Sequence, residues 1–353
     1  MKRKSSTLLL LSLLVGSIAV ADQHPPVYRI VPVQFPVPDD FQPTQVNRKL
    51  EIAVSENSAQ NHLWLGKSGH YRDLAIPASE GTVEVRGLND NSEILGLGFH
   101  DPNAGFDHGF IWRHGQFEDL TPPSGTTAID VVDINNRDQV VGYLTDSANQ
   151  TRPVLWEEGH FSNLPVLPGG VPTNWWNGTE VYQINDAGVA VGHSNTSQLL
   201  QPIPVMWLYG VLRQLPLPEN GNNGVAYAIN NRNHAVGVAN LFFIDASVPQ
   251  EPLLWRDGGV TILPLPTGDT LPVTTSINDC DEIVGYAAAD GLYQALLWEH
   301  GAVYDLHSLV SDSDPLKQTV TLQLAERILD SGVIEVFGYT GSQSGFYLLI
   351  PET

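Results

Sequence analysis

Three carboxylates have the clearest potential for chemistry, because they share one position in a repeated phrase of the sequence. In one copy the phrase runs from Ile134 to Gly142, and Asp130 stands four residues before it; Glu84 and Glu180 stand four residues before the neighbouring copies. Three converging carboxylates can hold a hard cation such as calcium, or raise one another's pKa for acid and base chemistry. The competing interpretation is coincidence, because the chain carries 39 acidic residues.

Two groups of large apolar side chains offer a different chemistry, the stacking of a ligand ring. They are the adjacent pairs Trp175 with Trp176 and Phe242 with Phe243. Both pairs fall in connections of variable length outside the repeated phrases, where binding residues are commonly found. They can contact a sugar ring or an extracellular protein, or they can pack within the fold.

Other reactive motifs are missing from the sequence. It contains no His-Glu-x-x-His, no phosphate-binding loop and no Gly-x-Ser-x-Gly elbow. The single Cys280 excludes an internal disulfide and a thiolate metal cluster, and it stands at a turn position where other copies have unrelated residues. His100 and His108 stand near two aspartates, which fits a polar surface loop. A binding protein is therefore favoured over an enzyme, and we assign no catalytic residue.

The candidate residues must be positioned by a unit that returns about every 43 to 51 residues. The phrase just described has seven copies, which begin at Val46, Leu88, Ile134, Ile184, Ile229, Ile277 and Ile328. Five copies continue to a Trp that is followed by Gly three residues later and by Leu eight residues later: Trp112, Trp156, Trp207, Trp255 and Trp298. A repeated position implies a repeated structural role, so these Trp are expected to pack between units. The repeated Asn and Asp are expected to form tight turns with left-handed backbone.

Each copy has the pattern of four short strands. In the second copy they cover 83–89, 94–99, 109–112 and 117–120, which are rich in β-branched and aromatic residues and are separated by Gly, Asn, Asp and Pro. No long window has apolar residues at helical spacing, and 32 Gly and 25 Pro interrupt the chain. These patterns predict an all-β fold, a seven-bladed β-propeller with four-stranded blades.

The last copy contains only three strands, so we expect its fourth strand to come from the N-terminus. Residues 27–33 resemble an outer strand and precede the first copy. A strand from there would close the ring and remove two open sheet edges. The short, constant turns then define a plain face of the propeller. The longer connections, among them 165–179, 238–251 and 307–321, define a variable-loop face on which function is expected.

The first residues have the parts of a secretory signal peptide: basic residues, an apolar run and small residues that end at Ala21. We therefore divide the chain into a signal peptide (1–21), a Pro-rich lead-in with the closing strand (22–45) and the propeller repeats (46–353). The net charge of −22 disfavours nucleic acid and anionic lipid as partners. No segment is long enough to span a membrane. A secreted or periplasmic monomer is expected.

The repeated phrase, followed by two apolar residues and Trp-x-x-Gly, resembles the extracellular HAF-repeat proteins of bacteria. The resemblance spans residues 28–351, and the His-Ala-Phe triplet itself is closest at His108-Gly109-Phe110. It implies secretion and a repeat fold. It supplies no catalytic residue.

The sequence thus favours a secreted or periplasmic binding module that acts through its variable-loop face on a glycan or an extracellular protein. One alternative is an extracellular carbohydrate-active enzyme, a hydrolase or lyase, that uses Glu84, Asp130 and Glu180; a glycosidase would need two of these carboxylates at a defined separation. Another alternative is a structural surface or matrix protein. The sequence identifies no definite cofactor, and calcium at the three carboxylates is the candidate.

Overall fold

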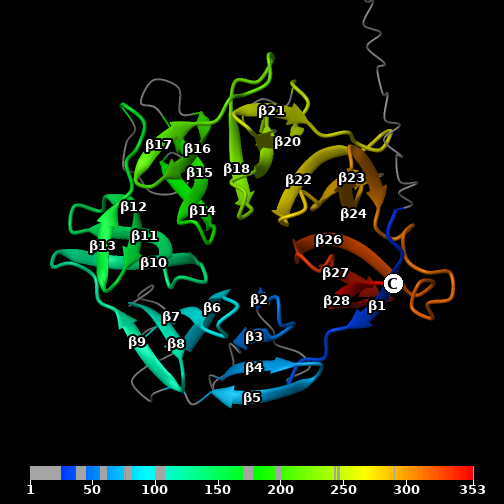
Figure 1. Ribbon diagram of the computed structural model, residues 1–353, viewed down its shortest axis with the longest axis horizontal. Helices are drawn as coiled ribbons and strands as arrows, with labels where there is room; N and C mark the ends of the chain where they lie inside the picture. The colour runs from blue at the N-terminus through cyan, green and yellow to red at the C-terminus, as the bar shows by residue number, and fades with distance from the viewer. Residues whose placement is uncertain are drawn as a thin grey trace, which may run out of the picture.

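The structure, a computed structural model, describes residues 25–36, 45–55, 62–74, 76, 82–99, 108–169, 178–195, 201–241, 244, 247–289 and 291–352. These residues form seven four-stranded antiparallel sheets, arranged as blades in a ring (Figure 1). The innermost strands surround a central channel, and residues at their ends line a cavity there. No helix occurs among the described residues. The predicted all-β, seven-bladed propeller is confirmed.

In six blades the strands follow chain order from the centre outward, and in the seventh β26 to β28 do so before β1 is added at the outer edge, so successive copies of the repeat are successive blades. The innermost strands are β2 (Gln45–Val46), β6 (Thr82–Leu88), β10 (Thr126–Ile134), β14 (Thr179–Ile184), β18 (Gly224–Ile229), β22 (Thr270–Ile277) and β26 (Val320–Ile328). The second strands are β3 (Ile52–Ser55), β7 (Ile94–Phe99), β11 (Val140–Asp146), β15 (Val189–Asn195), β19 (Ala235–Ala239), β23 (Ile283–Ala289) and β27 (Ile334–Thr340).

The outer half of each blade comes from the phrase around the repeated Trp. The third strands are β4 (Leu63–Lys67), β8 (His108–Arg113), β12 (Thr151–Glu157), β16 (Pro202–Leu208), β20 (Glu251–Arg256), β24 (Leu292–Glu299) and β28 (Gln343–Pro351). The outermost strands are β5 (His70–Leu74), β9 (Gln116–Leu120), β13 (His160–Asn163), β17 (Val211–Gln214), β21 (Gly259–Ile262), β25 (Ala302–Asp305) and, in the seventh blade, β1 (Tyr28–Pro32). The strands expected in the second copy match β6 to β9 within one residue at each end.

A β-bulge in the innermost strand explains the glycine that ends the repeated phrase. The strand pairing shifts register at the same place in β6, β10, β14, β18 and β22, at the residue three positions before the repeated Asn. The bulge brings a backbone carbonyl of the inner strand against the second strand. A Cβ at Gly142 would overlap the carbonyl oxygen of Asp130, and one at Gly192 would overlap that of Glu180. Only glycine fits beside the bulge.

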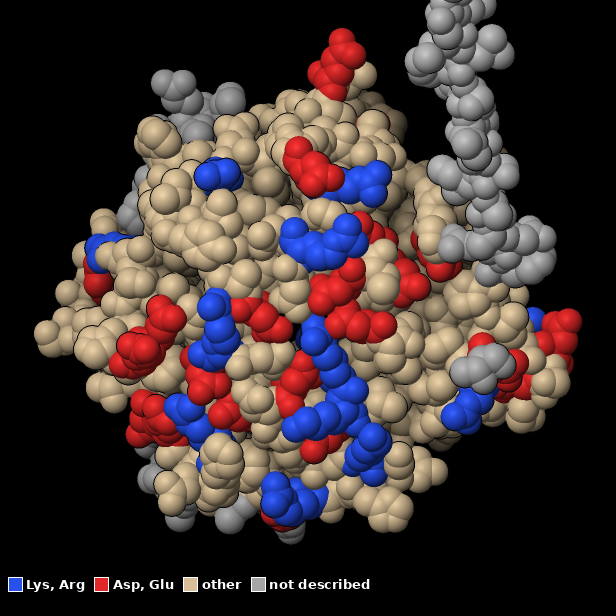
Figure 2. Space-filling view, viewed as in Figure 1, with Lys and Arg blue, Asp and Glu red and all other residues tan. Residues whose placement is uncertain are grey.

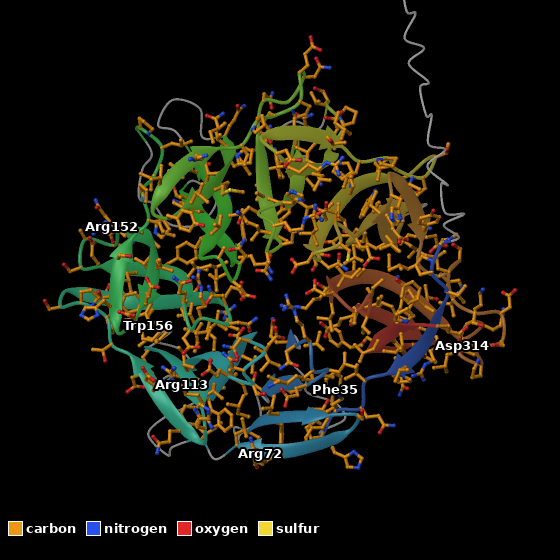
Figure 3. All side chains as sticks on the ribbon, in the orientation of Figure 1. Phe35, Arg72, Arg113, Arg152, Trp156 and Asp314 are labelled. Carbon is orange, nitrogen blue, oxygen red and sulfur yellow. The ribbon has the colours of Figure 1, made fainter. Side chains whose placement is uncertain are left out.

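The repeated Trp residues lie between blades, as the repeat predicted. Trp112, Trp156, Trp207, Trp255 and Trp298 are each at most 5% exposed. The indole Nε1 atoms of Trp207, Trp255 and Trp298 donate hydrogen bonds to the carbonyl oxygens of Pro165, Pro216 and Pro264, at 2.8, 2.6 and 2.6 Å, in the segments that enter their blades. Side chains fill the spaces between the sheets around the ring (Figure 3). The five repeated Trp residues therefore have a structural role.

The ring closes through the N-terminus, which confirms the predicted closing strand. β1 pairs antiparallel with β28, from Tyr28 opposite Pro351 to Pro32 opposite Tyr347. Tyr28 and Ile30 are buried in one apolar cluster with residues of the last two blades. In the described part of the chain no helix is long and apolar enough to cross a membrane.

Candidate functional site in the central channel

The repeated Asn forms the turn between the first and second strands. In the third blade, Asn135 Oδ1 accepts hydrogen bonds from the backbone N–H groups of Arg137 and Gln139, at 2.9 and 3.0 Å. Asp138, between them in sequence, has a φ of +61°. Asn47, Asn89, Asn185, Asn230 and Asn278 accept the same pair of bonds. The expected left-handed turns are confirmed, and we call the side of the propeller that carries them the turn face.

The same Asn side chains also join neighbouring blades, a role that the sequence did not reveal. Asn185 Nδ2 donates to the Asn230 carbonyl oxygen at 2.8 Å, and each other repeated Asn donates to the equivalent carbonyl of the following blade at 2.9 to 3.2 Å. The seventh copy has Leu329 at this position, and a leucine has no amide to donate. The junction between the seventh and first blades therefore needs other contacts.

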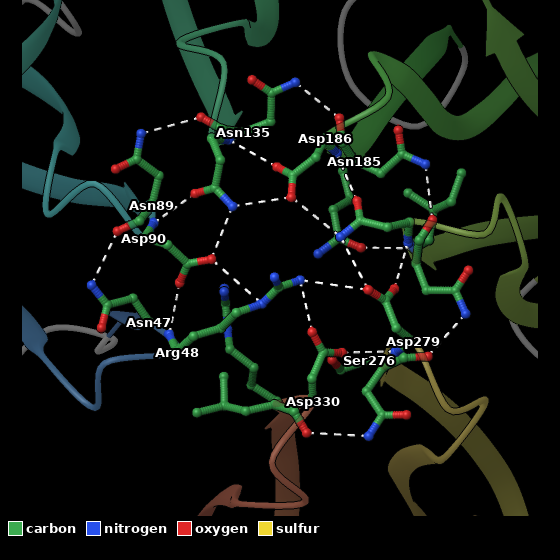
Figure 4. A pocket seen from close by; sticks show the side chains of 18 of the residues that line it. Asn47, Arg48, Asn89, Asp90, Asn135, Asn185, Asp186, Ser276, Asp279 and Asp330 are labelled. Atoms are coloured by element: carbon green, nitrogen blue, oxygen red, sulfur yellow. Dashed lines mark hydrogen bonds and ion pairs between the residues drawn. The ribbon is translucent and has the colours of Figure 1, made fainter.

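One residue further along, seven side chains form a ring at the turn-face end of the channel. This turn-face ring consists of Arg48, Asp90, Asn136, Asp186, Asn231, Asp279 and Asp330 (Figure 4). The side-chain Oδ1 of each of the last six accepts the backbone N–H of the preceding member, at 2.7 to 2.9 Å. Arg48 completes the ring, with its Nη2 at 2.8 Å from Asp330 Oδ2.

The remaining carboxylate oxygens of the ring are also paired. Asn136 Nδ2 donates to Oδ2 of Asp90 and Asp186, at 2.9 and 3.0 Å, and the Arg48 guanidinium lies 3.4 and 3.6 Å from Oδ2 of Asp90 and Asp279. Basic and acidic side chains gather around the centre of this face (Figure 2). Because protein groups already engage both oxygens of every ring Asp, the ring is a connector between blades and offers little to a ligand.

A polar cavity of about 140 Å³ is lined by this ring and by side chains of the inner strands, among them Asp133, Gln183 and Arg327. Asp133 Oδ2 accepts the Ile184 N–H at 3.0 Å, across the blade boundary. Burial raises the pKa of Asp133 from its ordinary 3.8 to about 6, an effect that the Arg327 guanidinium partly offsets. Asp133 thus carries a carboxyl group that titrates near neutral pH.

The three carboxylates predicted from the sequence lie farther from the turn face. Glu84, Asp130 and Glu180 are on β6, β10 and β14, five residues before the turn Asn, or roughly 16 Å along the strand. Arg86, at the bulge of β6, has its Nη2 at 3.4 Å from Glu84 Oε2 and at 3.8 Å from Asp130 Oδ1. The structure therefore brings Glu84 and Asp130 to one guanidinium, which the sequence analysis did not anticipate.

Glu180 belongs to a different set of contacts. It accepts the hydroxyl hydrogen of Tyr182, whose Oη also lies 3.3 Å from His193 Nδ1. Burial, and then the Glu180 charge, raise the pKa of Tyr182 far above its ordinary value. His193 is 3% exposed, and burial lowers its pKa to about 4, so its ring is neutral at pH 7. Tyr182 occupies the same bulge position as Arg86, three residues before the repeated Asn.

We call these six residues (Glu84, Arg86, Asp130, Glu180, Tyr182 and His193) the loop-side cluster. Burial raises the pKa of Asp130, against the opposing effect of Arg86. Within the part of the chain that the structure describes, no three His, Cys, Asp or Glu side chains are arranged to hold a metal ion. Calcium at Glu84, Asp130 and Glu180 stays a prediction, and such a cation would have to share the site with the positive charge of Arg86.

The other sequence candidates are placed as follows. Trp175, Trp176, Phe242 and Phe243 lie outside the described residues, as does His100. Cys280 is an exposed turn residue without a disulfide. The connection at 307–321, expected on the variable-loop face, packs in part against β1: Leu309 O accepts the Tyr28 N–H at 2.9 Å. That part of the connection holds the closing strand.

Comparison with family models and with curated proteins finds no match for this sequence. Solved structures do match the fold. The oligogalacturonate lyase of Vibrio parahaemolyticus has a TM-score of 0.58 and 8% identity over 92% of this chain and 91% of its own. The β-propeller domain of the Trilobed protease of Pyrococcus furiosus has a TM-score of 0.56 and 6% identity, over 89% of this chain and 93% of its own. Virginiamycin B lyase of Staphylococcus aureus has 0.53 and 10%, over 92% and 100%. At these identities the likeness is one of fold alone: the chain is a seven-bladed β-propeller.

Proposed function

We propose that the protein is a binding module that takes its ligand at the loop-side end of the central channel. The observation that supports this proposal most strongly is that the polar groups at the two ends of the central channel differ in how completely they are hydrogen-bonded. In the turn-face ring, protein groups engage both oxygens of every Asp. In the loop-side cluster, two buried atoms, His193 Nε2 and Asp130 Oδ1, have no hydrogen-bond partner among the described residues, and the Arg86 guanidinium lies 3.8 Å from Asp130 Oδ1. A buried polar atom without a partner is costly, and a bound ligand or water can relieve that cost.

The chemistry of the cluster indicates what such a ligand should offer. Carboxylates accept hydrogen bonds, and the neutral His193 ring can accept one at Nε2 if Nδ1 carries the proton toward Tyr182. Solvent reaches this part of the channel, since the side chains of Glu84, Arg86 and Asp130 are 23, 31 and 38% exposed. A ligand rich in hydroxyl or amino groups fits this set of acceptors, and a glycan or a polar segment of an extracellular protein has such groups.

The proposal also includes the cellular location of the binding module and the type of repeat protein to which it belongs. A secretory leader at residues 1–21 and the repeated phrases support a secreted or periplasmic protein of the HAF-repeat type. Trp175, Trp176, Phe242 and Phe243 stay candidates for the contact with a sugar ring, because they fall in the long connections of the variable-loop face. The propellers of similar fold belong to two lyases and a protease, so the fold does not choose among activities.

A glycan array with the mature protein, followed by calorimetric titration of the glycan that binds, tests the proposal. Glu180→Gln and Asp130→Asn should weaken binding, because each removes a charged acceptor of the loop-side cluster. Asp186→Asn is the matched control, since it removes one carboxylate charge from the turn-face ring. Circular dichroism would establish that each variant is folded. Equal loss of affinity in all three variants, or loss in Asp186→Asn alone, would contradict the proposed location.

A carbohydrate-active enzyme is the second candidate, and the raised pKa of Asp130 favours it. A glycosidase uses one protonated and one ionised carboxyl group, and burial raises the pKa of Asp130, in the direction that the protonated member of such a pair requires. Product analysis on the bound glycan distinguishes the two functions. Turnover that Asp130→Asn abolishes would establish the enzyme, and binding without turnover would establish the module.

A further inference from the structure

The closing strand β1 is hydrogen-bonded along both of its edges. On one edge it pairs with β28, and beyond the ladder Val33 N donates to Phe346 O at 2.9 Å. On the other edge it forms a parallel bridge with Val310: Tyr28 N donates to Leu309 O at 2.9 Å and Ser311 N donates to Tyr28 O at 2.8 Å. The strand therefore lies in a groove between β28 and the segment 309–314.

A side chain completes the second wall of the groove. Asp314 Oδ2 accepts the backbone N–H of Ile30 at 2.7 Å, where a neighbouring strand would otherwise place a carbonyl (Figure 3). Two side chains of β1 anchor it from within: Tyr28 and Ile30 are 2 and 6% exposed, while Arg29 between them is exposed. The groove thus recognises an extended backbone with two apolar anchors spaced two residues apart, a form of recognition by strand addition.

A short connection is the covalent link between β1 and the first blade of the same chain. Residues 33–44 join β1 to β2, and 12 residues can extend over about 40 Å. The backbone hydrogen bonds of β1 go to β28 and segment 309–314. Its side chains pack against the last two blades and, through Val31, against the first blade. Each copy of the chain carries an identical strand. Exchange of an identical element between copies is a low-cost route to association.

We propose that the groove between β28 and segment 309–314 is a strand-binding site that also accepts, in trans, residues 28–32 of a second copy of this chain. The ligand is an extended peptide with the pattern Tyr-x-Ile. The tether places the chain's own strand at an effective concentration on the order of millimolar, so folded dilute protein closes in cis. Exchange takes place when chains fold together at high concentration. This proposal is independent of the ligand proposed for the channel.

A disulfide across the groove tests the proposal with the full mature chain. Val31 and Leu348 are directly opposite each other in the ladder and pack in one cluster, as a cross-strand disulfide requires. In a Cys280→Ser background, one tagged chain carries Val31→Cys and a second carries Leu348→Cys. The two are unfolded, mixed and refolded together over a range of concentrations, then oxidised and separated by mass.

We expect a covalent pair of one tagged and one untagged chain, which increases with the concentration during refolding. Val211→Cys in place of Val31→Cys is the matched control, since Val211 is exposed on the outer strand of another blade, and it should yield no such pair. A single chain with both Val31→Cys and Leu348→Cys should form its disulfide internally and stay a monomer. Monomers alone in the mixed sample, with the internal disulfide formed in the single chain, would overturn exchange. Failure of that internal disulfide would overturn the groove itself.

Discussion

The side chain of each repeated Asn both forms a turn and joins two blades through hydrogen bonds. Asn185→Ala should therefore destabilise the protein more than an ordinary polar substitution. Asn185 Oδ1 accepts the N–H groups of Ala187 and Val189 at 3.0 and 2.9 Å. Its Nδ2 donates to Asn230 O and Asn233 Oδ1, both at 2.8 Å. The first pair of bonds forms the turn, and the second pair joins the fourth blade to the fifth.

The magnitude follows from these four bonds. A hydrogen bond within a protein contributes roughly 0.5 to 1.5 kcal/mol net, and a buried partner left unpaired costs toward the upper end. Asn185 is only 5% exposed, so water cannot easily replace its side chain. We therefore expect Asn185→Ala to lower the free energy of unfolding by about 4 kcal/mol.

Urea unfolding of the mature protein, followed by tryptophan fluorescence, measures this loss. Asn91→Ala is the matched control: it removes the same side chain from a turn of the second blade, where the exposed Asn91 donates one hydrogen bond to Asn136 O at 3.1 Å. The control should lose about 0.5 kcal/mol or less, as exposed surface substitutions do. If Asn185→Ala and Asn91→Ala unfold at the same urea concentration, the repeated Asn does not hold the blades together and the reasoning fails.

Three further outcomes follow from other contacts. Trp207→Ala should cost about 3 to 5 kcal/mol in urea unfolding, the range for a buried large aromatic, and leave the ligand affinity of the folded protein unchanged; lost affinity with unchanged stability would instead make the Trp a binding residue. The pKa of Asp133 is raised to about 6, so its protonated form is favoured on folding, and its contribution to stability is present below pH 4 and lost as the pH rises through 6. The unfolding free energy of the wild type should thus fall relative to that of Asp133→Asn by at most about 3 kcal/mol between pH 4 and 7; parallel curves would contradict this. If calcium must share the site with Arg86, millimolar calcium should raise the melting temperature of Arg86→Gln more than that of the wild type in calorimetric scans, and equal shifts would exclude a role for Arg86.

The architecture could be predicted from the sequence because the unit that forms a blade occurs there in seven copies. The repeated Asn predicts a turn in six copies, the repeated Trp predicts an interblade packing residue in five, and the missing fourth strand of the last copy predicts β1. Each of these features depends on local chemistry: left-handed backbone, apolar alternation and an open sheet edge. A feature that depends on local chemistry has the same residues in each copy of the repeat, so it can be recognised in the sequence.

The contacts that connect blades could not be predicted in the same way. The hydrogen bond from Asn185 Nδ2 to Asn230 O spans 45 residues, and the alignment of copies does not say that a turn amide lies within reach of the next turn. Arg86 and Tyr182 share a bulge position that only strand pairing reveals. Length variation marked the connection at 307–321 as functional, whereas segment 309–314 pairs with β1, because a closing strand needs a partner on its second edge as well.

The central claim, that ligand binds at the loop-side end of the channel and the turn face is structural, is tested most directly by hydrogen exchange. The mature protein would be compared with and without a saturating amount of the glycan that the array identifies. We expect ligand to slow exchange at residues 82–86, 128–131 and 179–182, which carry the loop-side cluster, and to leave the turns at 135–139 and 185–189 unchanged. Slowed exchange in those turns, with no change around Asp130 and Glu180, would contradict the account.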